Sequence, residues 1–369
     1  DLWAKRVKEK LEPYFPKQTG ENIYAYLWAR TVACPSTGKP VPLSTNWWLS
    51  KEPAVAVRLV AEPSMEQPCF EIVRGANALA TTPGVGTLSH GVARSPWTGE
   101  TIDSGYIKAE AQKGRIAQIL YAVALKKPGG FDFRIPTDED HEAINRAENE
   151  LDKAKPSWLA AGLIPTEQVP TGNDKRPLLY GINTWADFFT PRQLLSLGIT
   201  LEALKATQLE LQQQETHEHY LAIASLLGLV VSKCVDYNSR QTFWDTERGI
   251  RHAFSRHDFA FRWNSAEFDA SGNLLPWAVE QVASAYSEIS NIASPSQRSL
   301  LFADNKRAID NLRVFQGSAN NVGFIQDESL HNITVDPPYY DNVQYAELSD
   351  FFYVWLKRSV GHLFPEFFQ

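Results

Sequence analysis

The stretch HNITVDPPYYDNVQYAELSDFFYVWLKR, residues 331–358, decides how we interpret this sequence of 369 residues. Its first residues predict a buried strand, and its aromatic-rich second half predicts a helix. Between them lies a rigid turn, Asp336-Pro337-Pro338-Tyr339. Open α/β sheets bind ligands in the crevice outside the carboxyl ends of their strands, where this turn is expected. At average amino-acid composition, the tetrapeptide should occur by chance in roughly one chain per thousand of this length. The alternative to a functional turn is an ordinary Pro-Pro turn.

The turn has groups suited to chemistry on an aromatic amine. The exocyclic amine of adenine or cytosine is a poor nucleophile, because its lone pair is delocalised into the ring. A carboxylate can accept a hydrogen bond from one N–H of the amine, and a carbonyl of the Pro-Pro segment can accept one from the other N–H. The lone pair of the amine nitrogen then points at an electrophilic methyl group. Proline fixes φ and removes N–H donors, and Tyr339 can stack on a base flipped out of a duplex. Such catalysis consists of positioning and electrostatic preorganisation.

The composition is that of an ordinary globular protein, with 43% hydrophobic and 21% charged residues. No segment approaches the ~20 apolar residues of a membrane span, so we expect no membrane partner. A net charge of −7 does not indicate nucleic-acid binding, although binding needs only a local basic face. Cys34, Cys69 and Cys234 are far apart and odd in number, which favours a reducing, cytoplasmic location over a disulfide framework. Because the chain opens on Asp1 and closes on apolar residues, we expect it to be the middle of a longer protein.

We expect three regions: a β-rich region over 1–155, a mainly helical region over 156–300, and a segment over 301–369 that carries the turn. Hydrophobic periodicity and turn residues give the elements within them. The predicted helices cover 2–15, 137–154, 191–213, 215–236 and 275–292. The predicted strands lie near 22–33, 42–49, 54–61, 69–74, 104–110, 116–125, 131–135 and 311–316. Thr190 is predicted to cap the third helix, with Pro191 at its first position.

A short internal repeat lies within the β-rich region. Residues 34–38 (CPSTG) and 95–99 (SPWTG) share the form C/S-P-x-T-G. A zinc ribbon uses two such turns, each C-P-x-C-G, to place four thiolates around one ion. Here Thr37, Ser95 and Thr98 stand at three of the four ligand positions, and hydroxyls are poor zinc ligands. We therefore expect a ribbon that binds no zinc, and the alternative is two unrelated Pro-Gly turns.

Residues 237–263 alternate arginines with aromatic residues. The segment holds five Arg against three acids, which suits phosphate contacts and stacking on unpaired bases. We take Arg240, Arg251 and Arg256 as candidate nucleic-acid contacts. The alternative is a structural cluster with intramolecular Arg–Asp pairs.

Five blocks together resemble a known family: residues 336–360, 26–35 (YLWARTVACP), 46–51 (NWWLSK), 183–195 (NTWADFFTPRQLL) and 106–115 (YIKAEAQKGR). They are similar to the DUF1156-type adenine-specific DNA methylases, large proteins with a zinc-ribbon insertion, some of which belong to anti-phage defence clusters. The resemblance implies an α/β fold in which a Rossmann-like methyltransferase sheet is interrupted by a β-rich ribbon-like insertion and a helical region. It also implies S-adenosyl-L-methionine as cofactor and double-stranded DNA with a flipped base as substrate.

The resemblance implies roles for individual residues of the turn. Asp336 and the Pro337 carbonyl would accept the hydrogen bonds of the target amine, Pro338 would stiffen the turn, and Tyr339 would stack on the base. Tyr340 or Asn342 would shape the pocket, although Tyr340 and Tyr345 could instead be core aromatics. We expect helix-core positions rather than cofactor contacts at a further set of residues: Phe351, Phe352, Val354 and Trp355.

The sequence departs from the family at the cofactor loop. A Gly-rich loop of the form D-P-F-x-G-x-G is absent, and Gly84-Val85-Gly86 is too short a match to replace it. Because this loop precedes the insertion in the family, we expect it upstream of Asp1. Gly317 and Ser318, after the predicted strand at 311–316, are the candidate cofactor contacts within the chain.

Three hypotheses follow from these patterns. The first is an S-adenosylmethionine-dependent DNA methyltransferase acting on adenine N6, in restriction-modification or in anti-phage defence with other subunits. The second is a non-catalytic DNA-binding or assembly subunit that keeps the base pocket. The third is methylation of RNA or of a protein amide, because related Asx-Pro-Pro-Tyr motifs serve those substrates.

Overall fold

The computed structural model describes residues 2–16, 19–172, 174–256, 258–259, 261–293, 312–315, 317–339 and 343–368. It has two compact units. The first unit comprises Asp1–Val279 and Gln344–Gln369, and the second comprises Glu280–Val343. The fold is mixed α/β, as the sequence predicts.

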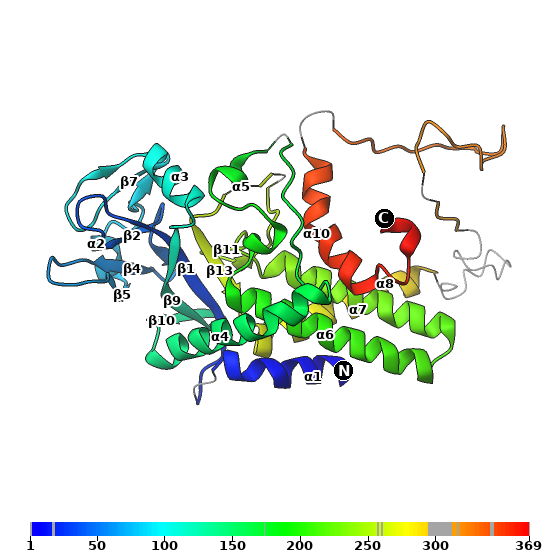
Figure 1. Cartoon of the computed structure of the whole chain (residues 1–369), viewed down its shortest axis with the longest axis horizontal. Coiled ribbons are helices and arrows are strands. Elements are labelled where there is room, and N and C mark those ends of the chain that lie inside the picture. Colours follow the sequence, from blue (N-terminus) through cyan, green and yellow to red (C-terminus); the bar gives the residue numbers. More distant parts are fainter. Residues whose placement is uncertain are drawn as a thin grey trace. The chain divides into compact units, whose positions relative to one another are not determined.

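A curled five-stranded sheet is the centre of the first unit (Figure 1). Its strands run in the order β10-β9-β1-β13, and β2 also pairs with β1. The register between β1 and β9 shifts twice, and such irregularities bend a strand. β1 is buried along nearly its whole length, as its aromatic and β-branched sequence predicts. The strands of this sheet are β1 (Ile23–Ala33), β2 (Pro40–Leu43), β9 (Ala117–Lys127), β10 (Gly130–Arg134) and β13 (Asn264–Phe268).

Three smaller antiparallel sheets accompany the central one. The first contains β3 (Trp48–Ser50), β4 (Val55–Val60) and β5 (Cys69–Arg74). The second contains β6 (Leu88–Ser89), β7 (Val92–Arg94) and β8 (Thr101–Ile102), and the third contains β11 (Phe243–Asp245) and β12 (Gly249–Arg251).

The strand predicted over 104–110 is wrong, because these residues belong to helix α3 (Ser104–Gln112). Asp103 caps this helix, and its Oδ1 accepts hydrogen bonds from the backbone N–H groups of Gly105 at 2.7 Å and Tyr106 at 3.0 Å. A capped first turn favours a helix over the strand that Tyr106 and Ile107 suggest.

The predicted long helices all form. Thr190 caps α6 as expected: its Oγ1 accepts the N–H of Gln193 at 3.2 Å, and Gln193 Oε1 accepts the N–H of Thr190 at 2.9 Å. The α-helices besides α3 are α1 (Leu2–Leu11), α2 (Ala76–Ala80), α4 (Asp138–Ala160), α5 (Arg176–Leu179), α6 (Pro191–Gln214), α7 (His217–Tyr237), α8 (Leu275–Ala293) and α10 (Tyr345–Val360). Short 3-10 or π turns lie at Glu12–Tyr14, Trp185–Phe188, Ala270–Leu274 and Pro365–Phe367.

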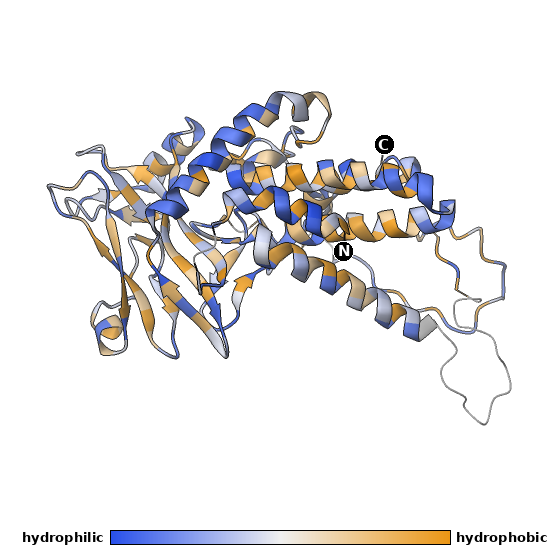
Figure 2. Cartoon of the chain, turned by 90° about the horizontal axis from the view of Figure 1, so that it is seen from below, coloured by the Kyte–Doolittle hydropathy of each residue, from blue (hydrophilic) through white to orange (hydrophobic). Residues whose placement is uncertain are grey.

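α7 packs against both α6 and α10. A Cβ added to Gly228 of α7 would lie 2.5 Å from Val360 Cγ1, so glycine allows the close approach of α10. Gln208 of α6 donates a hydrogen bond to the Ser359 carbonyl at 2.9 Å. Figure 2 shows apolar residues mixed with hydrophilic ones along the long helices. α7 is long and apolar enough to cross a membrane, but helices packed in a core meet the same criterion.

The face of α10 that contains Phe351 packs in an aromatic cluster. The Phe351 ring centroid lies 5.6 Å from that of Phe188 and 5.8 Å from that of Phe189. Phe351, Val354 and Trp355 are buried, as expected of helix-core positions, whereas Phe352 is half-buried and Tyr345 is exposed.

A buried ion pair joins the helices to the central sheet. Arg192 of α6 donates from Nε to Glu267 Oε1 at 2.8 Å and from Nη2 to Glu267 Oε2 at 2.9 Å. The Trp28 indole of β1 donates to the same carboxylate at 2.9 Å. Side-chain exposure is only 2% for Arg192 and 1% for Glu267. The pair is bidentate and dry, so it fixes how α6 lies on β13.

The expected Rossmann-like sheet is not formed by the described residues, whose strand pairs are all antiparallel. Residues 312–315 of the strand predicted over 311–316 have no regular structure, and residues 311 and 316 lie outside the described part. Residues 331–335, predicted as a buried strand, are irregular and exposed. A strand needs a neighbouring strand for its backbone hydrogen bonds. The described part of Glu280–Val343 contains no strand that could pair with either segment.

Candidate nucleic-acid interface

Asp336-Pro337-Pro338-Tyr339 lies in the second unit, in a segment without regular secondary structure. The whole tetrapeptide is exposed, including Tyr339 at 63% and the neighbouring Val335 at 75%. Along the chain, α10 begins six residues after Tyr339. The candidate residues Tyr340 and Asn342 lie between them and fall outside the described residues. The Asp336 carboxylate and the Tyr339 ring therefore lie at the surface, but they do not lie at the end of a described strand.

The candidate cofactor contacts Gly317 and Ser318 do not fit S-adenosylmethionine. Both residues are exposed and irregular. A Cβ added to Gly317 would meet no atom within 4 Å, so the space on that side of the residue is open. A cofactor of this size needs a concave site that buries most of its surface. We assign no step of chemistry to these two residues.

The three candidate arginines occupy different environments. Arg240 is half-buried: its Nη1 donates to the Asp187 carbonyl at 3.3 Å and its Nη2 to Gln118 Oε1 at 3.4 Å, and burial lowers its pKa. Arg251 is half-buried on β12. Arg256 is exposed and lies 3.4 Å from Asp258 Oδ2, which is the intramolecular pairing of the alternative interpretation. Arg256 therefore lies at the surface, whereas Arg240 and Arg251 are both half-buried.

The basic-aromatic segment forms one wall of a cavity of about 360 Å³, which we call the aromatic pocket. The other wall comes from the start of β3 and from Tyr121 of β9. Its aromatic residues are Trp48, Tyr121, Phe243, Trp244, Phe261 and Trp263. Its polar residues are Thr45, Asn46, Arg262, Asn264 and Ser265.

Contacts around the aromatic pocket hold its side chains in place. The Trp244 indole donates to the Leu49 carbonyl at 2.7 Å. The Arg262 guanidinium lies 4.1 Å from the centre of the Phe243 ring, and burial followed by the charge of Arg256 lowers its pKa. The Phe261 ring stacks on Tyr180 with centroids 4.0 Å apart. These fixed rings and amides could stack on a planar heterocycle and hydrogen-bond to its edge.

The two C/S-P-x-T-G turns have the same hydrogen bonds. Gly38 N–H donates to the Cys34 carbonyl at 2.8 Å, and Gly99 N–H donates to the Ser95 carbonyl at 2.9 Å. The turns also meet, because Ser95 Oγ lies 3.3 Å from Cys34 Sγ. This pairing favours the ribbon interpretation over two unrelated turns.

A carboxylate lies where the ribbon's two turns meet. The Cys34 thiol donates to Glu100 Oε1 at 2.8 Å, and hydrogen bonds from Cys34 and Ser36 lower the pKa of Glu100. Among the described residues, no group of three or more His, Cys, Asp or Glu side chains could hold a metal ion.

Sequence reasoning missed the aromatic pocket, because its walls come from four separate segments. Two local signals were present: the block Asn46-Trp47-Trp48, and the aromatic alternation at Phe259, Phe261 and Trp263. Neither signal says which strands bring these residues together.

Comparisons with family models, curated proteins and solved structures find no match to this chain.

Proposed function

We propose that this chain is the base-handling part of an amino-group DNA methyltransferase, with adenine N6 as the target. The observation that carries this proposal is the exposed turn Asp336-Pro337-Pro338-Tyr339, which contains a carboxylate, two prolines without N–H groups, and an aromatic ring. Asp336 would accept one hydrogen bond from the amine and the Pro337 carbonyl would accept the other. Tyr339 would stack on the flipped base, and Pro338 would keep the turn rigid.

S-adenosylmethionine would supply the electrophilic methyl group when bound. Because Gly317 and Ser318 do not fit it, we assign its site to none of the described residues. The role of the described chain is then to hold and orient the base.

The aromatic pocket supports a nucleic-acid substrate. Base stacking on aromatic side chains is largely independent of base identity and suits DNA that has been locally opened. The exposed Arg256 and half-buried Arg251 lie on the segment that forms one wall of the pocket and could contact phosphates. We propose that duplex DNA with a displaced base is the substrate, in restriction-modification or in anti-phage defence together with other subunits.

Labelled-methyl incorporation into plasmid DNA tests this function. The full-length gene product, with any partner subunits, is compared as wild type, Asp336→Ala and Asp327→Ala. Asp327 is a matched control because it is an exposed acid in the same unit. We expect incorporation to fall at least about 100-fold in Asp336→Ala, because the carboxylate that accepts a hydrogen bond from the target amine is lost, and to stay unchanged in Asp327→Ala. Equal incorporation by Asp336→Ala and wild type would exclude the proposed role.

The absence of a D-P-F-x-G-x-G loop from this sequence favours a second candidate, a non-catalytic DNA-binding or assembly subunit. Calorimetry separates the two candidates, with S-adenosylmethionine and an oligonucleotide duplex titrated separately into the full-length protein and its partners. Binding of both ligands supports the methyltransferase. Binding of the duplex alone supports the second candidate.

A further inference from the structure

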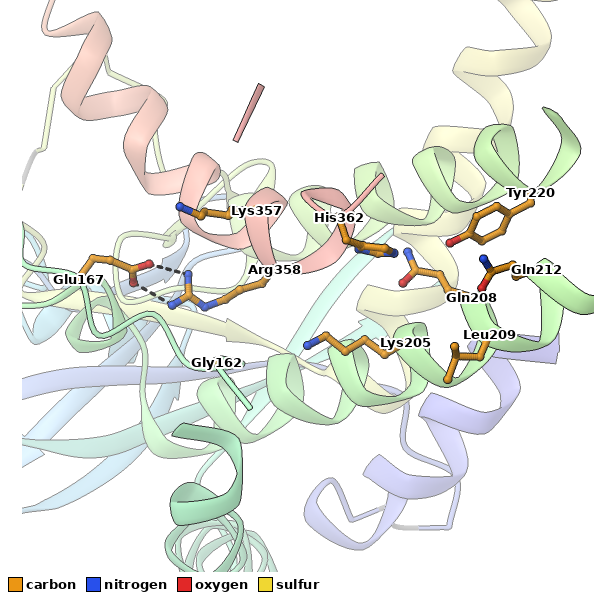
Figure 3. Close-up of a pocket in the computed structure, with 10 residues that line it drawn as sticks. All are labelled: Gly162, Glu167, Lys205, Gln208, Leu209, Gln212, Tyr220, Lys357, Arg358 and His362. Atoms are coloured by element: carbon orange, nitrogen blue, oxygen red, sulfur yellow. Dashed lines mark hydrogen bonds and ion pairs between the residues drawn. The ribbon is translucent and has the colours of Figure 1, made fainter. Parts of the chain in front are cut away.

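A second cavity, of about 560 Å³, lies among the helices of the first unit (Figure 3). It is lined by α6, by the start of α7, by the end of α10 and the turn after it, and by the loop that follows α4. Its Glu, Lys, Arg and His residues are Glu167, Lys205, Lys357, Arg358 and His362, and its remaining residues are Gly162, Gln208, Leu209, Gln212 and Tyr220. We call it the cationic pocket.

The charges of this pocket are unbalanced. Glu167 neutralises Arg358, since Nη1 and Nη2 of Arg358 each lie 2.9 Å from an oxygen of Glu167. Lys205 has no ion pair among the described residues, so the lining keeps a positive charge there, in a chain whose net charge is −7. An anion that enters the cavity would balance this charge.

The fold holds the cations close enough to repel one another. Partial burial, followed by the charge of Arg358, lowers the pKa of Lys205. Partial burial, followed by the charge of Lys205, lowers the pKa of His362. Arg358 cannot turn away, because its guanidinium also donates to the carbonyls of Val354 at 2.8 Å and Ile164 at 3.0 Å. An anion placed between Lys205 and His362 would relieve this repulsion.

The other lining residues suit an organic group. Figure 3 shows Tyr220, Gln212 and Leu209 at one end of the pocket, and Lys205 and His362 nearer its middle. The Tyr220 ring offers an apolar surface, and Gln212 is an amide that can donate and accept. The volume lies within the ~300–1,000 Å³ of small-molecule sites and is large enough for one nucleotide.

We propose that the cationic pocket binds a phosphate group carried by a nucleotide, with the phosphate between Lys205 and His362 and the nucleoside toward Tyr220. Two sources share this chemistry: a free mononucleotide and a nucleotide of a nucleic-acid strand. The site is independent of the proposed methyl transfer, because no residue of the cationic pocket belongs to the Asp336 turn or to the aromatic pocket.

Calorimetry with AMP and with inorganic phosphate tests the site in the full-length protein. We expect AMP to bind more tightly than phosphate, and Lys205→Met to weaken AMP binding at least tenfold. Lys153→Met is the matched control, because Lys153 is 74% exposed on α4 and lies outside the pocket. A DNA oligonucleotide that competes with AMP identifies a strand as the source, and absence of competition identifies the free nucleotide. Failure of AMP, phosphate and oligonucleotide to bind, or equal AMP affinity in Lys205→Met, overturns the proposal.

Thermal unfolding separates ligand binding from a purely structural role of Lys205. Because Lys205 faces Arg358 and His362 across the cavity, Lys205→Met should not lower the melting temperature of the free protein. AMP should raise the melting temperature of the wild type and of Lys153→Met but not of Lys205→Met. A marked loss of stability in Lys205→Met, with the AMP effect intact, would contradict a ligand-binding role.

Sulfate gives a test of His362, because this probe does not titrate near neutral pH. The groups facing His362 are Lys205, Arg358 with its partner Glu167, Lys357 and Tyr220. In the free protein the lowered pKa keeps His362 mostly neutral at pH 7. A bound anion raises that pKa, so binding takes up a proton and should tighten as the pH falls from 8 to 6. His362→Gln should lose this pH dependence, and the same slope in that variant would exclude His362 as a contact.

Discussion

The Asp336 turn and the aromatic pocket are opposite kinds of candidate site. The turn places its groups in four consecutive residues and is exposed in an irregular segment. The aromatic pocket takes its groups from four segments, and strand pairing, an indole hydrogen bond and ring stacking hold them. The turn therefore has the functional groups for a specific reaction but no rigid support. The aromatic pocket has a rigid support, but its rings and amides suit many planar ligands.

This difference teaches that the two sites depend on the fold to different degrees. A change in the core should disturb the aromatic pocket and leave the turn unaffected. A change in the turn should alter chemistry and leave stability unaffected. The following substitutions test that division, from the largest expected effect to the smallest.

Breaking the buried ion pair should have the largest effect. Arg192→Met leaves the Glu267 carboxylate buried without its bidentate partner, and Glu267 lies on β13, the strand that contributes Asn264 to the aromatic pocket. We expect the free energy of unfolding to fall by about 3–5 kcal/mol, measured by urea denaturation. Nucleic-acid binding through the aromatic pocket should also be weaker in Arg192→Met than in the wild type.

Arg6→Met is the matched control. Arg6 pairs with Glu210 at 2.8 Å, but these side chains are 37% and 43% exposed, so the loss should stay below about 1 kcal/mol. The double variant Arg192→Met/Glu267→Leu removes both buried charges and should recover part of the stability. If Arg192→Met is no more destabilised than Arg6→Met, the ion pair does not fix the helices on the sheet.

Many helices and strands of the first unit could be predicted from the sequence, because long segments with a regular apolar pattern indicate their secondary structure. β1 and the helices α1, α4, α6 and α7 follow from apolar periodicity and capping residues. The error at α3 arose because Tyr106 and Ile107 favour a strand locally, while the cap at Asp103 decides the outcome. The segments over 312–315 and 331–335 have apolar residues typical of strands but no described strand partner in their unit, and sequence alone does not reveal a missing partner.

The candidate sites also differ in how far the sequence predicts them. The Asp336 turn and the paired turns at Cys34 and Ser95 are contiguous motifs, so the sequence shows their chemistry. The aromatic pocket and the cationic pocket depend on which elements pack together, and no local pattern brings Trp48 near Trp263 or Lys205 near His362.

The paired turns are a third kind of region, contiguous in sequence and also fixed by the fold. If their geometry is that of a zinc ribbon, the triple substitution Thr37→Cys, Ser95→Cys and Thr98→Cys should create a zinc site with Cys34. We expect one zinc per chain by metal analysis, and a stabilisation of about 2.7 kcal/mol when free zinc is 100 times its dissociation constant. Adding Cys34→Ser should reduce the affinity sharply. A triple variant that binds no zinc would show that the turns do not aim these four positions at one point.

Removing one wall of the aromatic pocket should have a smaller effect. Trp48→Ala takes away a half-buried ring and should weaken binding of a single-stranded oligonucleotide by about 1–3 kcal/mol, measured by fluorescence anisotropy. Tyr286→Ala removes an exposed ring of α8 and should have no effect. Equal affinities of Trp48→Ala and wild type would show that bases do not stack in this pocket.

The smallest change in stability is expected at the turn itself. Asp336→Asn keeps the shape of the side chain and replaces an exposed carboxylate, so the free energy of unfolding should change by less than about 0.5 kcal/mol. Methyl incorporation should nevertheless fall, because a neutral amide no longer offers two acceptor oxygens to the target amine. Urea denaturation and methyl incorporation on the same preparation measure both quantities. A loss of stability equal to that of Arg192→Met would place Asp336 among the residues that support the fold, and the distinction between the turn and the aromatic pocket would then be wrong.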